Sequence, residues 1–184
     1  MGPTFTVGRK ILMVLVAALL LLAAGGTVHA PSADSRSTAM RSMSFLIGKW
    51  QCHEHIVGGT DRAFSMVVTT ALADAWMKAE TEYPAVGSAP AWREEFYWTY
   101  IPLTMSWTLD TFDSGGNYGD FGATWWKGPT IDWHGRRIVM GHMDDQAIEW
   151  TKSSSARVEI REYDSDAAGH LASLSSATSC GKAG

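Results

Sequence analysis

Gly48-Lys49-Trp50-Gln51-Cys52 is the stretch that decides the fold, together with Cys180 near the other end of the chain. Cys52 and Cys180 are the two cysteines of the sequence. Alternation of apolar and polar residues places Cys52 on the first predicted strand and Cys180 on the last. The first and last strands of a closed barrel are neighbours. We therefore predict a Cys52–Cys180 disulfide, with two free buried thiols as the alternative.

Residues 1–30 have the pattern of a signal peptide. Arg9 and Lys10 precede an apolar run of 14 residues, Ile11 to Ala24, and small residues lead to Ala30. A membrane-spanning helix needs about 20 apolar residues, so we expect cleavage and no membrane span in the mature chain. An uncleaved anchor is the alternative. The predicted location is periplasmic or secreted, where cysteines pair.

The length and net charge of the chain restrict the number of domains and the kinds of partner. Cleavage leaves 154 residues, which suits one domain. We predict a flexible lead-in at 31–39 and a barrel domain at 40–182. The formal net charge is −4, and it becomes −6 when two of the fifteen Lys and Arg leave with residues 1–30. An acidic chain without a basic run excludes nucleic acid as a partner. The oligomeric state is left open.

After Gly48 the apolar residues recur with a period of two, in segments separated by turn residues. Met40, Met43 and Leu46 or Ile47 have helical spacing and predict a helix of one to two turns before the first strand. The pattern predicts an all-β fold, a closed antiparallel up-and-down barrel of about ten strands. The predicted strands lie near 48–57, 62–71, 75–83, 92–101, 103–111, 117–126, 136–142, 147–152, 156–163 and 170–180.

Aromatic residues form stripes on single strand faces. The sequence has nine tryptophans. Alternation along one predicted strand places four aromatic residues on a single face of that strand. Alternation along the next predicted strand places three apolar residues on a single face. Such stripes fit either a filled core or the wall of a ligand cavity. The stripe residues are Trp92, Phe96, Trp98 and Tyr100, then Met105, Trp107 and Leu109.

The orientation of Trp50 also determines which neighbouring side chains of its strand point into the barrel. If Trp50 points into the barrel, so does Glu54, whereas His53 and His55 face solvent. A carboxylate inside a barrel needs a partner or a shifted pKa. Glu54 then orients a ligand or acts as a general base, or it forms a structural pair with Arg93 or Arg157. The candidate ligand-binding residues are Trp50, Glu54, Trp98, Trp107, His142 and Trp150.

Known catalytic and metal-binding patterns are missing from the sequence. There is no Gly-x-Ser-x-Gly, Cys-x-x-Cys or phosphate loop. His53-x-His55 supplies two ligands, whereas zinc usually takes three or four from the protein. The adjacent Trp125 and Trp126 must face opposite sides of a strand, and we interpret them as capping one end of the barrel, with a partner surface as the alternative. We predict no metal site and no resident cofactor.

The phrase Phe45-Leu46-Ile47-Gly48-Lys49-Trp50 resembles the Gly-x-Trp signature of lipocalins and other calycins. The wider pattern is similar to bacterial extracytoplasmic domains of unknown function with a lipocalin-like barrel. It includes Trp76, then Glu80 and Glu82, a hairpin at 113–117 and a Cys180-x-Lys182 end. The resemblance implies that Trp50 closes one end of the barrel. Lipocalins pack a last-strand arginine on that tryptophan, and residues 170–180 contain none.

Nitrobindin-type barrels share a similar opening and bind haem through a histidine near the end of the chain. His142 and His170 are the nearest counterparts, which makes haem a less favoured alternative to no cofactor. The favoured function is that of an exported, non-enzymatic binding protein for a small apolar or amphiphilic ligand. Two less favoured hypotheses are a barrel enzyme of isomerase or cyclase type using Glu54 and a histidine, and a structural barrel without a ligand. A ligand pocket of about 300 Å³ or more would separate the binding protein from the structural barrel.

Overall fold

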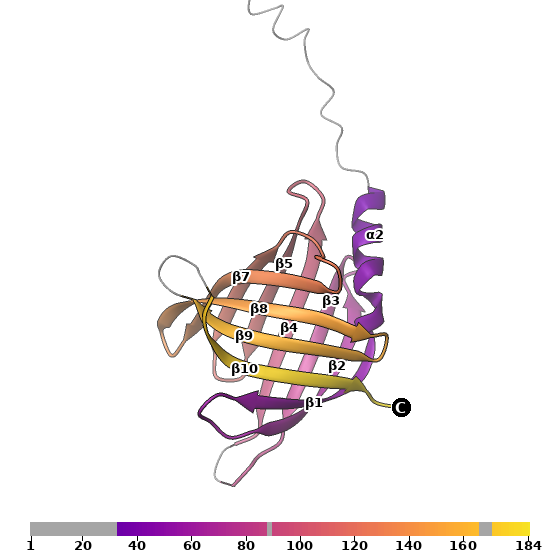
Figure 1. Ribbon diagram of the computed structural model, residues 1–184. Coiled ribbons are helices and arrows are strands. Elements are labelled where there is room, and N and C mark those ends of the chain that lie inside the picture. The colour runs from indigo at the N-terminus through magenta and orange to yellow at the C-terminus, as the bar shows by residue number, and fades with distance from the viewer. Residues whose placement is uncertain (1–32, 88–89, 166–170) are drawn as a thin grey trace, which may run out of the picture. The chain divides into compact units, whose positions relative to one another are not determined.

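The described part of the chain folds into a closed barrel of ten antiparallel strands, preceded by a helix (Figure 1). The computed structural model describes residues 33–87, 90–165 and 171–184. Each strand pairs with the next, and β10 returns to pair with β1. The predicted all-β, up-and-down architecture is therefore confirmed. The predicted signal peptide lies outside the described residues.

The barrel strands are β1 (Gly48–Ile56), β2 (Arg62–Ala71), β3 (Trp76–Tyr83), β4 (Trp92–Ile101), β5 (Ser106–Asp113), β6 (Tyr118–Ala123), β7 (Thr130–Val139), β8 (His142–Ser154), β9 (Arg157–Ser165) and β10 (Leu171–Lys182). Helix α2 (Ala33–Met43) continues into a 3₁₀ turn, η1 (Ser44–Leu46). Within the described residues, no helix has both the length and the apolar character needed to cross a membrane.

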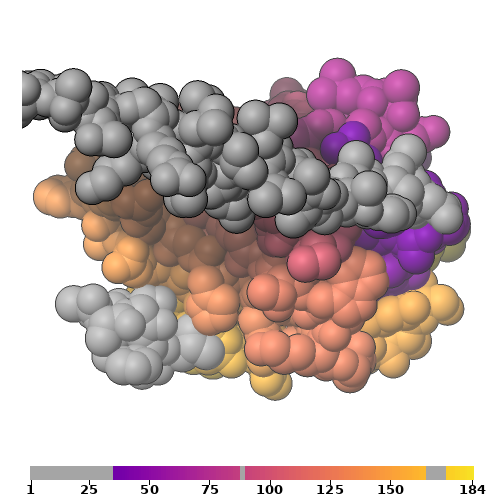
Figure 2. Space-filling view, turned by 90° about the horizontal axis from the view of Figure 1, so that it is seen from above, coloured from indigo at the N-terminus to yellow at the C-terminus, as the bar shows by residue number. Residues whose placement is uncertain are grey.

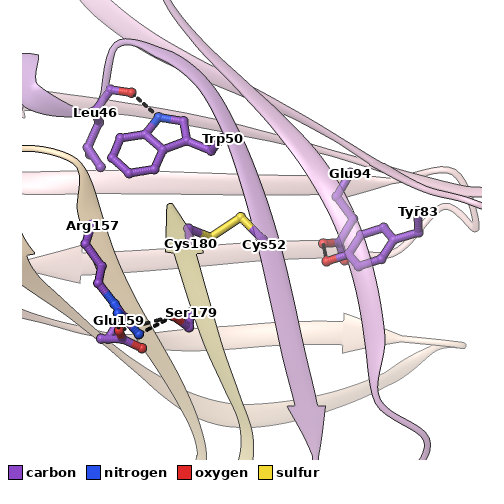
Figure 3. The surroundings of a disulfide bond; sticks show 9 residues. All are labelled: Leu46, Trp50, Cys52, Tyr83, Glu94, Arg157, Glu159, Ser179 and Cys180. Atoms are coloured by element: carbon purple, nitrogen blue, oxygen red, sulfur yellow. Dashed lines mark hydrogen bonds and ion pairs between the residues drawn. A yellow bond between two sulfur atoms is a disulfide. The ribbon is translucent and has the colours of Figure 1, made fainter. Parts of the chain in front are cut away.

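The predicted disulfide closes the barrel at the seam between its first and last strands. Cys52 and Cys180 are directly opposite in the β1–β10 register, and an S–S bond joins them (Figure 3). Both side chains are buried in the core. The bond indicates that the protein folds in an oxidising compartment.

Helix α2 begins earlier than the sequence predicts. Residues 33–39, expected as a flexible lead-in, are helical. Ala39, Met40 and Met43 are buried, whereas Arg36 and Arg41 are exposed. The segment is short of apolar residues, so its helix depends on packing this one face against the barrel rather than on its own propensity.

Three strand boundaries differ from the prediction. The turn expected at Asp144-Asp145 lies instead at Met140-Gly141, where both residues have positive φ, as a two-residue hairpin requires. At its other end, β7 begins at Thr130 rather than near residue 136. β6 ends at Ala123, which leaves Trp125 and Trp126 in a loop, and β5 begins only at Ser106.

Tryptophans fill the half of the barrel that lies nearest to α2. Four of them are fully buried, and three of these, Trp98, Trp107 and Trp133, contact neighbouring aromatic rings. The rings of Trp98 and Trp150 meet edge to face with centroids 5.4 Å apart, and Trp133 lies 5.2 Å from Trp150. Such contacts add about 0.5–1.5 kcal/mol each beyond burial. The fully buried tryptophans are Trp50, Trp98, Trp107 and Trp133.

Trp50 joins the barrel to the turn that precedes it. Its Nε1 donates a hydrogen bond of 2.6 Å to the carbonyl oxygen of Leu46 (Figure 3). Gly48, with φ of 132°, supplies the backbone turn between the two residues. The Gly-x-Trp motif therefore closes this end of the barrel, as the resemblance implies.

Replacing Trp50 by Phe is expected to lower the free energy of unfolding by about 1–3 kcal/mol, because the buried Leu46 carbonyl loses its partner. The aromatic bulk is largely kept, so the barrel should still fold. Urea unfolding of Trp50→Phe measures the loss. Trp125→Phe, at a half-exposed loop position, is the matched control and should change stability by less than about 0.5 kcal/mol. Equal effects of the two substitutions would contradict this role for the indole N–H.

Candidate functional site

A small cavity lies inside the barrel, between the packed tryptophans and the end opposite α2, called here the mouth. Its volume is about 50 Å³. The deep wall is apolar and the wall toward the mouth carries carboxylates and a tyrosine, so the cavity is amphiphilic. The apolar lining residues are Leu46, Phe64, Met66, Val68, Ala79, Phe96, Trp98, Ile148, Trp150, Val158 and Ile160, and the polar ones are Glu54, Thr81, Tyr83, Glu94, Glu162 and Thr178.

The inward orientation of Glu54 is confirmed, but its predicted partners are wrong. Glu54 is 6% exposed, and its Oε2 accepts a hydrogen bond of 2.5 Å from Arg62 Nε. Arg93 and Arg157 are exposed on the outer face and pair instead with Glu82 and Glu159. Arg62 is favoured because it lies directly opposite Glu54 in the β1–β2 register, where side chains share a face.

Tyr83 connects the Glu54 pair to a second one. The Arg62 guanidinium carbon lies 4.4 Å from the centroid of the Tyr83 ring, and the Tyr83 hydroxyl donates a 3.2 Å hydrogen bond to Glu94 Oε2 (Figure 3). Burial, reinforced by the charges of Glu94 and Glu54, raises the pKa of the Tyr83 hydroxyl above its ordinary value. Tyr83 is therefore a neutral hydrogen-bond donor at any pH at which the barrel works.

Glu94 is held from the other side of the barrel by Arg137. Arg137 Nη2 donates to Glu94 Oε1 at 2.8 Å and approaches Asp113 Oδ2 at 3.4 Å. Asp113 itself holds the β5–β6 hairpin, because its Oδ1 accepts from the backbone N–H groups of Gly115 and Asn117. Glu94 and Arg137 are thus tied to a rigid turn. Within the described residues, the buried Nε of Arg137 has no hydrogen-bond partner.

Glu162 is the third carboxylate of the mouth and differs from the other two. Across the described residues, its carboxylate forms neither a hydrogen bond nor an ion pair. Burial of the carboxyl group, helped by Glu94 and Glu54 and opposed by Arg137 and Arg62, raises its pKa to about 7. Glu162 therefore gains or loses a proton near neutral pH. Three carboxylates line the cavity at the mouth, and Arg62 and Arg137 pair with two of them; Arg137 also approaches Asp113, outside the lining.

The structure brings together half of the predicted ligand-binding residues. Glu54, Trp98 and Trp150 line the cavity. Trp50 and Trp107 are buried in the tryptophan-filled half and do not reach the cavity wall. His142 is exposed at the start of β8, outside the barrel. Met105, expected to share the inward face of Trp107, lies in the β4–β5 turn instead.

Acid–base chemistry with a histidine finds no support in the described part of the chain. His53 and His55 are exposed on β1, as their parity predicts, and His134 and His142 are exposed as well. His170 lies outside the described residues. The cavity lining thus offers haem no histidine ligand, and a porphyrin is larger than the cavity. Among the described residues there is also no group of three or more His, Cys, Asp or Glu able to hold a metal ion.

Five residues of the site were not found from the sequence: Arg62, Tyr83, Glu94, Arg137 and Glu162. Arg62 had a usable signal, since Gly58-Gly59 centres the β1–β2 hairpin and counting outward places Arg62 opposite Glu54. Glu162 also had one, since it continues the inward parity of Val158 and Ile160. Arg137 reaches Glu94 across 43 residues of sequence, and no local pattern indicates such a pairing.

Fold and site together define a closed ten-stranded barrel with an amphiphilic interior and a charged mouth. No family model matches the chain, and no curated protein matches it either. One solved structure similar to it is a redesigned β-barrel, with 10% sequence identity and a TM-score of 0.46, covering 78% of this chain and 96% of the other. The predicted lipocalin-like family is not confirmed by these comparisons.

Proposed function

We propose that the protein is an exported, periplasmic or secreted binding protein for a small amphiphilic ligand. The observation that carries the proposal is the division of the cavity into an apolar wall at Trp98 and Trp150 and a charged wall at the mouth. An apolar ligand body would lie against the two indoles. A polar head would lie among Glu54, Glu94 and Glu162.

The charge balance of the mouth favours a cationic head group. Glu54 and Glu94 are neutralised by Arg62 and Arg137, whereas Glu162 has no ion-pair partner among the described residues. An ammonium group placed beside Glu162 would supply the missing positive charge and form a charge-assisted hydrogen bond. A carboxylate head would add a fourth negative charge. We therefore expect alkyl ammonium ligands to bind better than alkyl carboxylates.

The cavity volume sets the size of what binds without rearrangement. About 50 Å³ is well below the roughly 300 Å³ of ordinary ligand pockets. A larger ligand must displace side chains, and Met66 in the wall is the most adaptable of them. The same small volume favours the second candidate function, a structural barrel that binds nothing.

Tryptophan fluorescence distinguishes the two functions. The probes are short alkyl chains of equal length that carry an ammonium, a carboxylate or a hydroxyl head. Quenching of Trp98 and Trp150 that saturates with the ammonium series supports the binding protein. Absence of saturable quenching with all three series, together with no added mass in native mass spectrometry, overturns it in favour of the structural barrel.

Glu162→Gln is expected to weaken the ammonium ligand about tenfold, because a charge-assisted hydrogen bond is lost, and to leave the hydroxyl ligand unchanged. Glu82→Gln is the matched control, since Glu82 is an exposed carboxylate that pairs with Arg93 on the outer face. The dissociation constants from the fluorescence titration provide the measurement. A similar loss with the hydroxyl ligand would show that Glu162 acts through the barrel rather than on the head group.

A further inference from the structure

The end of the barrel that carries α2 has a rim in which exposed apolar turn residues lie beside exposed basic residues. Four turns close this end: residues 72–75, 102–105, 124–129 and 155–156. Leu72, Leu103 and Met105 are 74%, 77% and 73% exposed, and Trp125 is half-exposed. We call these four residues, with the basic residues named below, the helix-side rim.

The apolar tips are neighbours in the fold. Thr99 of β4 donates a hydrogen bond to the carbonyl oxygen of Ala75, so the turn bearing Leu72 lies against the strand that leads to Leu103. Trp125 packs on Tyr100 and Trp107, with ring centroids 5.5 and 6.2 Å apart, at the ends of the strands that flank the 102–105 turn. The tips therefore project together along one side of the rim.

Exposed cations occupy the rest of the rim. Lys152 lies over the ring of Phe45 and Lys182 over the ring of Trp50, with their Nζ atoms 4.5 and 5.4 Å from the ring centroids. Lys127 follows Trp126, which packs on the same Phe45 ring, and its Nζ lies 2.9 Å from Asp132 Oδ2. Asp74, in the 72–75 turn, is an exposed carboxylate of the rim, so the positive charge is an excess rather than the sole charge there. Figure 2 shows α2, in indigo, at this end beside orange and yellow segments of the later strands. The exposed basic residues of the rim are Arg36, Arg41, Lys49, Lys127, Lys152 and Lys182.

The opposite end has the other sign of charge. Its exposed residues include several carboxylates near the mouth turns: Asp61, Glu82, Asp144, Asp145 and Asp164. It also has exposed apolar residues, among them Val57, Val86 and Met140. Apolar exposure alone therefore does not distinguish the two ends. What distinguishes the helix-side rim is the combination of apolar tips with positive charge.

We propose that the helix-side rim docks on the surface of an anionic lipid membrane, with Leu72, Leu103, Met105 and Trp125 entering the interface and the rim cations contacting headgroup phosphates. Apolar side chains flanked by Lys and Arg bind anionic bilayers by burial and electrostatic attraction together. An amphipathic tryptophan is favoured at the interface. Docking at this rim leaves the acidic mouth facing away from the like-charged membrane.

The chain outside the described residues supports a membrane as the occupant. Residues 1–32 join α2 at its N-terminus, and their sequence contains the apolar run Ile11 to Ala24. Arg36, in the first turns of α2, donates a 3.3 Å hydrogen bond to the Tyr100 carbonyl, close to the 102–105 turn. The first turns of α2, the start of the described chain, therefore lie on the apolar side of the rim.

The test is sedimentation of the full chain with vesicles of phosphatidylcholine alone and of phosphatidylcholine with phosphatidylglycerol. We expect binding to the anionic vesicles that weakens as salt is added. Leu72→Asn, Leu103→Ser and Met105→Asn combined should weaken binding about tenfold or more. Asn is chosen because Leu72 and Met105 have positive φ, which Asn tolerates. Every variant keeps residues 1–32, so differences between variants report on the rim.

The mouth provides matched controls. Val57→Ser, Val86→Ser and Met140→Asn remove comparable exposed apolar residues there, and Met140 shares the positive φ of Met105. This control should bind vesicles as the unmodified protein does. Lys127→Gln, Lys152→Gln and Lys182→Gln remove half of the rim cations and should clearly reduce the preference for phosphatidylglycerol, whereas Arg93→Gln, Arg136→Gln and Arg161→Gln, away from the rim, should not.

Three results would overturn the proposal: equal losses from the rim and mouth variants, equal binding to both kinds of vesicle, or no vesicle binding at all. A rim variant that alters only the oligomeric state in light scattering would assign the surface to a second copy of the chain instead. Thermal melts of all variants establish that they remain folded.

Discussion

Removing the Cys52–Cys180 disulfide is expected to lower the free energy of unfolding by about 3–5 kcal/mol. The bond joins residues 128 apart, and the unfolded chain gains the entropy of a loop of that length when the bond is lost. For a domain of this size the loss corresponds to a fall in Tm of roughly 6–20 °C. The barrel seam itself persists without the bond, because β1 and β10 are paired along seven residues of each strand.

The measurement is urea unfolding of the variant Cys52→Ala with Cys180→Ala, compared with the oxidised protein. Each single substitution removes the same bond, so both singles should lose nearly as much as the double. A double variant that loses much more than either single would show that buried sulfur packing, rather than the cross-link, supplies the stability. Loss of less than about 1 kcal/mol would contradict the loop-entropy argument.

The period-two pattern was the reliable part of the sequence. It placed Trp50, Cys52 and Glu54 inside the barrel and His53 and His55 outside, because strand side chains alternate between faces whatever lies around them. The same argument gives the disulfide, since strand order in an up-and-down barrel brings the ends of the chain together. These predictions needed no knowledge of distant contacts.

Boundaries set by turn chemistry were less reliable. Asp144-Asp145 has the composition of a turn, but both residues lie opposite arginines in the β7–β8 register, Asp144 across from Arg137 and Asp145 across from Arg136. Arg137 turns inward to Glu94 and Arg136 contacts the sulfur of Met143, so the backbone ladder rather than ion pairing holds the two aspartates in β8. Met140-Gly141 makes the turn even though methionine is uncommon at positive φ, so tertiary pairing prevails over local preference.

The partner of each interior charge depends on strand register rather than on composition. Arg93 and Arg157 are the partners that composition suggests for Glu54, yet both side chains lie on the outer face of the barrel. Arg62 has the correct face because it is the register neighbour of Glu54. The Glu94–Arg137 pair joins β4 to β7 across the barrel, and it becomes visible only when the cylinder is closed. Sequence could therefore predict that Glu54 is inside and, by counting outward from the β1–β2 hairpin, that Arg62 faces it, but not that Arg137 neutralises Glu94.

Glu162→Gln is expected to change how stability depends on pH. Burial raises the pKa of the Glu162 carboxyl from 4.5 to about 7, with Glu94 and Glu54 adding to the shift and Arg137 and Arg62 opposing it. Between those two pH values the folded protein binds more protons at this residue than the unfolded chain does. Stability therefore falls as pH rises through this window, by about 1.4 kcal/mol for each pH unit.

Glutamine has no proton to lose, so the variant should lack this fall and be about 3 kcal/mol more stable than the unmodified protein near pH 8. Near pH 4, where Glu162 is protonated in both states, the two proteins should have similar stability. Urea unfolding at a series of pH values from about 4 to 9 measures both curves. Glu82→Gln, which removes an exposed carboxylate, should follow the unmodified protein throughout. Parallel stability curves for Glu162→Gln and the unmodified protein would contradict the prediction, because they would mean that water solvates the Glu162 carboxylate. The proposal that Glu162 attracts a cationic ligand head would then fail as well.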